Sequence, residues 1–583
     1  MSTLRRERRG AAGRALGLAL GCAIVCGALR SQTVLWEVEA ATPGTIFGEY
    51  VLSAGDVDGD GASDLLVGEP GYNPGGSPDT GRILLFSGGD QTVLLSIVGP
   101  HAGAGFGSVL GRSGDLTGDG VPEVVARAYE GGPLPWTQQA TFVRVHSLGG
   151  GLIAQWAGET GAVVGDLDAN GLTDLVVVDK DWFPPVCTGK GRAYAISGGV
   201  GPVVGQWQCS GFEIGYALEP LGDVSGDGQP DFAFSSSGYW NGQIPSSLWV
   251  HSGLSVNPAW VQGFYNPPFI STATPTAVAA AGDVDGDGVG DILAGFPEDT
   301  PFLGATPTGM ARVMSGATGG ILHTFVGAFL NQRFGKSVGH LGDLDGDGRA
   351  DLLVSGSFMV EWYPPTPPLS GTSPLQGRAY VFSGETGGLL LEVSEAPPWD
   401  GFGSSVDGLG DLDGDDFPDF AVGEAWRRSP DVGRVIAFSA APAGIGVFGA
   451  SCASAGGPAP RIAGWPSASL GSTFTLRLSR ALPNAPGLLL LGLSNSLWSG
   501  ISLPVDLGPV GFPGCQLLVS PDFVLGTSTQ GSSTATGRAA VSLPIPTNPS
   551  LSNAVFYAQW IVVGLGGGLS AELTRGLAVS VHP

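Results

Sequence analysis

Short apolar runs separated by glycine-rich turns make up most of this chain. Apolar runs at residues 352–354, 377–382 and 389–393 are bounded by glycine clusters, and another run opens at residue 334. Runs of this kind are typical of strands packed in a sheet. The 99 glycines and 44 prolines interrupt the chain too often for long helices. The pattern therefore predicts an all-β protein.

An acidic motif recurs seven times among these runs. It reads Asp-x-Asp-x-Asp-Gly-x-x-Asp with some substitutions, and successive copies begin 51 to 68 residues apart. That period is too long for a solenoid coil and suits a four-stranded blade of a β-propeller. The seven copies therefore predict seven blades.

An extra apolar run precedes the first repeat. It covers residues 34–38, whereas the last repeat ends with its third apolar run, at residues 433–438. We expect the N-terminal run to supply the missing fourth strand of blade seven. Such closure leaves no open seam between the first and last blades.

The repeats carry a second signature around the acidic motif. Phe47-Gly48 opens the first repeat, and Val67-Gly68-Glu69-Pro70 follows its acidic loop. This combination resembles the FG-GAP repeat of integrin α-subunit propellers, over roughly residues 33–440. Blade three lacks the Phe-Gly opening, and blade four has Ile214-Gly215 instead. The resemblance implies an adhesion role, with the acidic loops on one face and the loops after each second strand on the other.

The acidic loops offer the ligands that calcium prefers. Calcium takes six to eight oxygen ligands, which carboxylates at positions 1, 3, 5 and 9 and the backbone carbonyl of position 7 can supply, while glycine at position 6 allows the bend. A single Asp-Gly dipeptide is explained by a hairpin turn alone, without a metal ion. Half of the 52 Asp and Glu residues lie in these loops, however, and such clusters repel without a cation. We expect up to seven calcium ions, one per blade, whose main role is to stabilise the fold. Magnesium suits the loops less well because it demands tighter coordination geometry.

The predicted ligands are the side chains at positions 1, 3, 5 and 9 of each loop. In blade order they are Asp56, Asp58, Asp60 and Asp64; Asp115, Thr117, Asp119 and Glu123; Asp166, Asp168, Asn170 and Asp174; Asp223, Ser225, Asp227 and Asp231; Asp283, Asp285, Asp287 and Asp291; Asp343, Asp345, Asp347 and Asp351; and Asp411, Asp413, Asp415 and Asp419. Thr117 and Glu123 make blade two the weakest predicted site. In blade seven, Asp416 stands where glycine belongs, which is expected to strain the bend.

The N-terminus has the pattern of an export signal. Five arginines between residues 5 and 14 precede an apolar run at residues 16–29, which is short for a membrane span. We expect residues 1–30 to be cleaved and the mature chain, which has no other candidate span, to be secreted or displayed at the cell surface. Cleavage removes six arginines and one glutamate, so the net charge of −26 becomes −31. A chain this acidic is not expected to bind nucleic acid.

Four cysteines remain after the predicted cleavage. An even count in an exported protein suggests disulfides. Three pairings are open, with buried free thiols as the alternative, and the domain boundaries favour Cys187–Cys209 and Cys452–Cys515.

The last part of the chain has a different composition. Residues 441–583 contain no acidic loop, and apolar or alternating runs occur at residues 473–478, 488–493, 539–543 and 554–563. These runs predict a β-sandwich. The expected organisation is therefore a signal peptide (1–30), a seven-bladed β-propeller (31–440) and a C-terminal β-sandwich (441–583).

The loops after the second strands suggest where a ligand binds. Each loop carries an aromatic residue, which either stacks on a sugar or anchors a protein partner, or else packs between blades. These residues are Tyr72, Trp136, Trp182, Trp240, Phe302, Trp362 and Trp426. The partner expected on this face is an extracellular protein or polysaccharide.

Catalytic motifs are missing from the sequence. The six histidines have no metal-ligand spacing, and neither a nucleophile elbow nor a phosphate loop occurs. We therefore expect a binding protein rather than an enzyme. Two alternatives stay open: a calcium-dependent lyase or glycosidase, which predicts a carboxylate pair or an Arg–carboxylate cluster in a deep central cleft, and a cell-envelope scaffold.

Overall fold

The computed structural model describes residues 32–583 except 78, 131–139, 183–190, 208–212, 238–245, 256, 265–273, 300–307, 330, 358–376, 395–400, 426–431, 443, 454–458, 532–536 and 565–569. The described residues form two compact units. The first runs as far as Gly342 and includes Leu352–Leu412 and Asp419–Ser439, and the second comprises Asp343–Asp351, Asp413–Pro418 and Ala440–Pro583. The predicted signal peptide, Cys187 and Cys209 lie outside the described residues.

The described part of the first unit contains seven antiparallel sheets of four strands each. Blade one consists of β2 (Val51–Gly55), β3 (Asp64–Glu69), β4 (Arg82–Phe86) and β5 (Val93–Val98), and blade two of β6 (Leu110–Gly114), β7 (Glu123–Glu130), β8 (Ala140–His146) and β9 (Leu152–Ala157). Blade three consists of β10 (Thr160–Gly165), β11 (Asp174–Asp179), β12 (Arg192–Ile196) and β13 (Val203–Trp207), and blade four of β14 (Glu213–Gly222), β15 (Asp231–Ser237), β16 (Ser246–Ser252) and β17 (Trp260–Phe264). Blade five consists of β18 (Ala277–Gly282), β19 (Asp291–Phe296), β20 (Met310–Met314) and β21 (Ile321–Val326), and blade six of β22 (Phe334–Gly342), β23 (Asp351–Gly356), β24 (Arg378–Phe382) and β25 (Leu389–Ser394). Two single-turn 3-10 helices, η1 (Pro74–Gly76) and η3 (Ser197–Gly199), lie in blades one and three.

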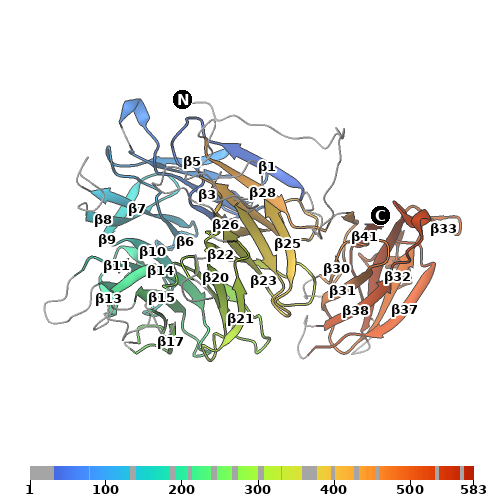
Figure 1. Ribbon diagram of the computed structural model, residues 1–583. Helices are drawn as coiled ribbons and strands as arrows, with labels where there is room; N and C mark the ends of the chain where they lie inside the picture. The colour runs from blue at the N-terminus through green and yellow to red at the C-terminus, as the bar shows by residue number, and fades with distance from the viewer. Residues whose placement is uncertain are drawn as a thin grey trace. The chain divides into compact units, whose positions relative to one another are not determined.

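Blade seven joins the two ends of the propeller. Its sheet has the order β1 (Val34–Glu39), β28 (Arg434–Ser439), β27 (Asp419–Glu424) and β26 (Phe402–Gly410). Val34 pairs with Phe438, and Figure 1 shows β1, in blue, beside β28, in orange. Arg434 pairs with Glu424 and also with Glu37, 2.8 Å from its Nη1. The predicted closure by the N-terminal strand is confirmed, and with it the seven-bladed propeller.

Burial falls from the second strand of each blade to the fourth. All six residues of β3 are buried, whereas Val93 and Val98 of β5 are more than a third exposed. The second and third strands therefore need apolar side chains on both faces, which explains their continuous apolar runs. Outer strands such as β5 need fewer, because one face meets water.

Where a blade opens with the Phe-Gly dipeptide, that dipeptide packs the blade against the one before it. Phe106 is fully buried, and Gly107 has a φ of 88°. A Cβ on Gly107 would lie 2.7 Å from the carbonyl oxygen of Arg82, in the third strand of blade one. Glycine is required here because its backbone has a left-handed φ and also touches the neighbouring blade. The same contact joins Gly48 to Arg434 across the closure.

The second unit contains a β-sandwich, as predicted. One sheet has the order β29 (Ile445–Phe448), β41 (Gly576–Ser580), β39 (Val555–Gly564), β32 (Pro486–Gly492) and β37 (Phe523–Ser528), with β40 (Ser570–Leu573) paired to β39. The other consists of β30 (Arg461–Trp465), β31 (Thr473–Ala481) and β38 (Gly537–Pro544). Phe474 and Leu476 of β31 share one core with Leu489 of β32 and Trp560 of β39, so the two sheets pack face to face. Two short hairpins, β33 (Leu497–Trp498) with β34 (Ile501–Ser502) and β35 (Val505–Asp506) with β36 (Gln516–Leu517), and the 3-10 helices η4 (Gly508–Val510) and η5 (Pro549–Leu551) complete the unit.

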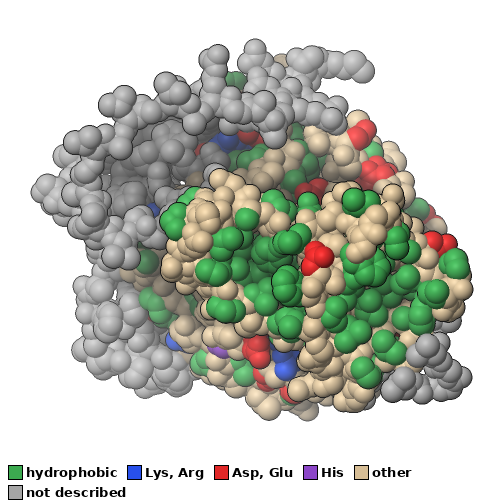
Figure 2. All heavy atoms as spheres, turned by 90° about the vertical axis from the view of Figure 1, so that its right-hand side faces the viewer, with side chains coloured by type: hydrophobic (Ala, Val, Ile, Leu, Met, Phe, Trp, Pro, Cys, Tyr) green, Lys and Arg blue, Asp and Glu red, His purple; other side chains and the backbone are tan. Residues whose placement is uncertain are grey.

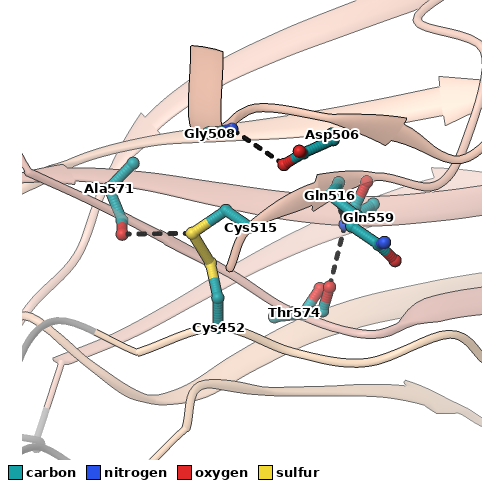
Figure 3. Close-up of a disulfide and its surroundings, with 8 residues drawn as sticks. All are labelled: Cys452, Asp506, Gly508, Cys515, Gln516, Gln559, Ala571 and Thr574. Carbon is teal, nitrogen blue, oxygen red and sulfur yellow. Dashed lines mark hydrogen bonds between the residues drawn. A yellow bond between two sulfur atoms is a disulfide. The ribbon is translucent and has the colours of Figure 1, made fainter. Parts of the chain in front are cut away.

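A disulfide links two parts of this sandwich (Figure 3). It joins Cys452 to Cys515, which is one of the two predicted pairs. Both cysteines are buried beside Ala571 and Leu573. Gln559 donates to the carbonyl oxygen of Thr574 at 2.9 Å nearby. The disulfide therefore ties the segment before β30 to the segment before β36.

Apolar side chains gather on the face shown in Figure 2. Among the described residues of the second unit, Leu493, Leu497, Val510 and Phe523 are each more than half exposed, and Phe523 lies on the edge strand β37. Among the described residues, no helix reaches the length and apolarity needed to cross a bilayer.

Candidate metal sites

The ninth residue of each acidic loop begins the second strand of its blade. In blade one this residue is Asp64, which is completely buried. Its Oδ2 accepts hydrogen bonds from the backbone N–H groups of Val57 (2.8 Å) and Asp58 (3.2 Å), and its Oδ1 accepts one from Gly88 (3.0 Å). Asp174 has the same arrangement in blade three. This carboxylate therefore ties the loop to the strand and to the turn after the third strand.

The first residue of each loop holds the tight bend. Asp56 accepts hydrogen bonds from the backbone N–H of Gly59 at 2.7 Å and of Gly61 at 3.0 Å. Gly61 has a φ of 93°, which costs glycine nothing. In blade seven the same position is Asp416, with a φ of 67°. A non-glycine residue in the left-handed region is strained, as the sequence led us to expect.

Three carboxylates converge in five of the described loops. One oxygen from each carboxylate lies within 4.8 Å of the others. The clusters are Asp56, Asp58 and Asp64; Asp166, Asp168 and Asp174; Asp283, Asp285 and Asp291; Asp343, Asp345 and Asp347; and Asp411, Asp413 and Asp419. Four of them combine positions 1, 3 and 9, and blade six combines positions 1, 3 and 5.

The fifth residue is not part of the carboxylate cluster in blades one and five. Asp60 Oδ2 accepts a hydrogen bond from Ser87 Oγ at 3.1 Å, and its Oδ1 accepts one from the backbone N–H of Ala62 at 2.8 Å. Asp287 accepts a similar bond from the backbone N–H of Val289 at 2.8 Å. The structure therefore gathers three of the four predicted side chains in each of these loops.

Blades two and four show no such cluster among the described residues. Both have a hydroxyl at position 3. Thr117 Oγ1 donates to Glu123 Oε1 at 3.3 Å, and Ser225 Oγ donates to Asp231 Oδ1 at 3.4 Å. A neutral donor there satisfies the ninth carboxylate without adding negative charge, so these loops need a cation less than the others.

The loop of blade six, Asp343–Asp351, belongs to the second unit and meets arginines there. Arg477 forms an ion pair with Asp345, and its Nη1 lies 3.8 Å from Asp347 Oδ2. Burial, together with the carboxylate of Asp347, raises the pKa of Asp345 to about 7. Arg477 therefore balances part of the charge of this loop, although Asp343 Oδ1 is buried and accepts no hydrogen bond from the described residues.

The electrostatics of the clusters fit a hard cation. Burial raises the pKa of Asp64, and the carboxylate of Asp58 adds to this effect, although backbone N–H donors oppose it. Asp174 and Asp291 show the same shift for the same reasons. A divalent cation among these oxygens would favour the ionised carboxylates. An oxygen-only donor set with several carboxylates is what calcium binds best in proteins.

Two of the seven predicted aromatic residues lie in the described part of the chain. The guanidinium group of Arg82 lies 3.9 Å from the ring centre of Tyr72, and that of Arg192 lies 5.3 Å from Trp182. Both rings are half-buried. Each is thus covered by an arginine from the third strand of its own blade. The other five, Trp136, Trp240, Phe302, Trp362 and Trp426, lie outside the described residues.

A cavity of about 370 Å³ lies where the inner strands of all seven blades meet. Inside it, Arg112 of β6 donates to both carboxylate oxygens of Asp407 in β26, at 2.8 and 3.3 Å, and to Glu219 Oε1 in β14, at 3.2 Å. Burial raises the pKa of Glu219 to about 6, with Asp407 adding to the rise and Arg112 opposing it. This cluster joins blades two, four and seven. No local motif indicates it, because Arg112 is 107 residues from Glu219 and 295 from Asp407.

Comparisons with known proteins agree with the signature seen in the repeats. Residues 50–86 match the FG-GAP repeat family. The chain is 30% identical to integrin alpha-5 of Xenopus laevis over 171 residues, 28% of this chain and 15% of the relative. It is 27% identical to integrin alpha-V of Gallus gallus over 237 residues, 36% of this chain and 20% of the relative. It is 29% identical to integrin alpha-PS2 of Drosophila melanogaster over 231 residues, 36% of this chain and 15% of the relative. The chain thus spans only about a sixth of the length of these relatives, and it is similar to the FG-GAP repeat family and to integrin α subunits.

Proposed function

We propose that this chain is an exported, calcium-stabilised propeller that binds an extracellular protein or polysaccharide as an adhesion module. The observation that carries the proposal is the convergence of three carboxylates in each of five described loops. A calcium ion would balance the charge of such a loop, and extracellular modules bind calcium with dissociation constants of about 10⁻⁴–10⁻³ M. The similarity to integrin α subunits supports the adhesive role.

The proposal includes the identity of the metal and its ligands. Calcium would be held by the side chains at positions 1, 3 and 9, with blades one, three, five and seven as the simplest sites. Blade six would bind more weakly because Arg477 supplies part of the charge. Blades two and four would bind weakest because each lacks a convergent triad of carboxylates. We also propose that residues 1–30 are removed on export and that residues 31–440 and 441–583 are the mature domains.

The polysaccharide-active alternative is favoured by one observation. It requires an Arg–carboxylate cluster in a central cleft, and Arg112, Asp407 and Glu219 form one in the central cavity. In this cluster, however, both carboxylates already pair with Arg112. A general acid or base must be able to exchange a proton with its substrate, so this pairing favours binding over catalysis.

The deciding experiment incubates the mature chain, from residue 31, with immobilised polysaccharides and cell-surface proteins. The panel is read in millimolar calcium and again with chelator, and soluble fragments are measured in the same wells. Calcium-dependent retention without fragments is the expected result. Release of fragments would replace the binding function with the enzymatic one, and absence of retention on every surface would overturn adhesion.

A further inference from the structure

Two cations and one carboxylate line one end of the central cavity. Glu159, which directly precedes β10, lies 3.3 Å from Arg127 Nη1 and 3.5 Å from Lys180 Nζ. Two cations thus share one carboxylate. All three residues line the cavity, and the Lys180 side chain is 44% exposed. Ligands can therefore reach this end from solvent, and we call it the cationic end.

The opposite charge prevails deeper along the same strands. Arg112 is a single cation between two carboxylates, Asp407 and Glu219, whose side chains are only 5% and 10% exposed. We call this cluster the anionic floor. Asp407 also accepts a hydrogen bond from the backbone N–H of Ser53 at 2.9 Å. The floor is therefore held in place by groups from blades one, two, four and seven.

The strand register separates the two ends along the cavity. The backbone N–H of Arg127 donates to the carbonyl oxygen of Val109 at 3.0 Å, so these two residues lie level. Val109 comes three residues before Arg112 on the same inner segment, which amounts to about 10 Å along a strand. The cavity therefore carries a fixed charge gradient, positive at the cationic end and negative at the floor.

This gradient selects the chemistry of a ligand. A simple anion is attracted by the cationic end and repelled by the anionic floor, and a simple cation is repelled by the cationic end and attracted by the floor. A molecule with both charges is attracted at both ends. The cavity volume is near the lower limit of pockets that take small molecules. Among the described residues, Tyr50 is the only aromatic one in the lining, and the others are aliphatic or polar. The described lining therefore offers few rings on which a sugar could stack.

We propose that the central cavity binds a small zwitterion of dipeptide size, whose two charges lie farther apart than those of an α-amino acid, with its carboxylate toward Arg127 and Lys180 and its ammonium group toward Asp407 and Glu219. Aliphatic side chains such as Val51 and Val278 contact the remainder of the ligand. Burial raises the pKa of Tyr50 to about 12, so its hydroxyl stays a neutral donor for the ligand at physiological pH. This site is independent of the proposed adhesion function and of the calcium loops.

Titration calorimetry on the mature chain in millimolar calcium tests the proposal. The probes are the twenty protein amino acids and diglycine, with N-acetyl-diglycine, diglycine amide and galacturonate as comparisons. Diglycine is expected to bind, and the free amino acids, whose two charges lie closer together, are expected to bind more weakly. Removing either charge from diglycine is expected to weaken binding at least tenfold.

Two lysine variants make the test specific. Lys180→Met is expected to weaken binding of the zwitterion at least tenfold. Lys336→Met is the matched control, because Lys336 does not line the cavity although its neighbour Ser337 does, and it should leave the affinity unchanged. Glu219→Gln should weaken the binding of zwitterions but not the binding of galacturonate. The proposal is overturned if no zwitterionic probe binds, if the capped probes bind equally well, or if Lys180→Met and Lys336→Met behave alike.

Discussion

Calcium should set the thermal stability of the propeller, and the size of the effect can be worked out from the loops. At a tenfold excess of calcium over its dissociation constant, each occupied site adds about 1.4 kcal/mol to the free energy of unfolding. The five described clusters together would add about 7 kcal/mol. For a unit of about 400 residues, whose unfolding entropy is about 0.8 kcal/mol per kelvin, this corresponds to a rise in Tm of about 8 °C.

Scanning calorimetry of the mature chain, in calcium, in magnesium and with chelator, measures this rise. Asp58→Asn should remove one site and lower Tm in calcium by one to two degrees, about a fifth of the total effect. Asp119→Asn is the matched control, because blade two shows no convergent triad. The backbone hydrogen bonds to Asp64 persist without metal, so the loss should be graded rather than complete unfolding. Equal Tm values in calcium and in chelator would refute the assignment of these loops as metal sites.

Three further predictions test the propeller itself. The pKa of Glu219 rises from 4.5 to about 6 on folding, so the folded state binds its proton more tightly. As the pH rises from 4.5 to 7.5, the wild-type chain should therefore lose about 1.6 kcal/mol of stability that Glu219→Gln does not lose. Urea titrations at pH 4.5 and 7.5 measure this, and an identical pH dependence in both proteins would contradict it. Deleting residues 32–39 leaves β28 as an open edge, so light scattering should detect self-association and the urea midpoint should fall. A monomer with an unchanged urea midpoint would show that the closure does not contribute to stability. Gly107→Ala should lower the urea midpoint more than Gly75→Ala, because both positions have positive φ but only Gly107 faces the Arg82 carbonyl oxygen. Equal shifts of the urea midpoint would show that this contact is unimportant.

The architecture could be predicted because the information is local and repeated. Seven acidic motifs at similar spacing indicate seven blades, and a missing fourth strand at one end with a spare strand at the other indicates closure. The ninth position of the motif could also be expected to be buried, since it directly precedes an apolar run and begins a fully buried strand. These features depend on neighbours within a few residues.

The details of the sites depend on contacts that spacing does not reveal. Asp60 turns toward Ser87, which comes from the end of the third strand, 27 residues later. Arg477 meets Asp345 from 132 residues away, and Arg112 meets Asp407 from 295. Each of these contacts decides how charge is balanced, yet none leaves a local pattern in the sequence. The alternation of carboxylates therefore predicted where acidic side chains gather but not which of them converge.

The pairing of β1 with β28 has a consequence for how the protein reaches its folded state. Val34 and Phe438 are the first and last partners of the ring, separated by nearly the whole propeller. In a chain that emerges from its N-terminus, β1 appears first and has to wait for six complete blades before its partner arrives. During that time both its exposed edge and the growing stack of blades are open to other strands. The ring therefore stays open until its last blade is made, and its stability depends on the final strand reaching the first one.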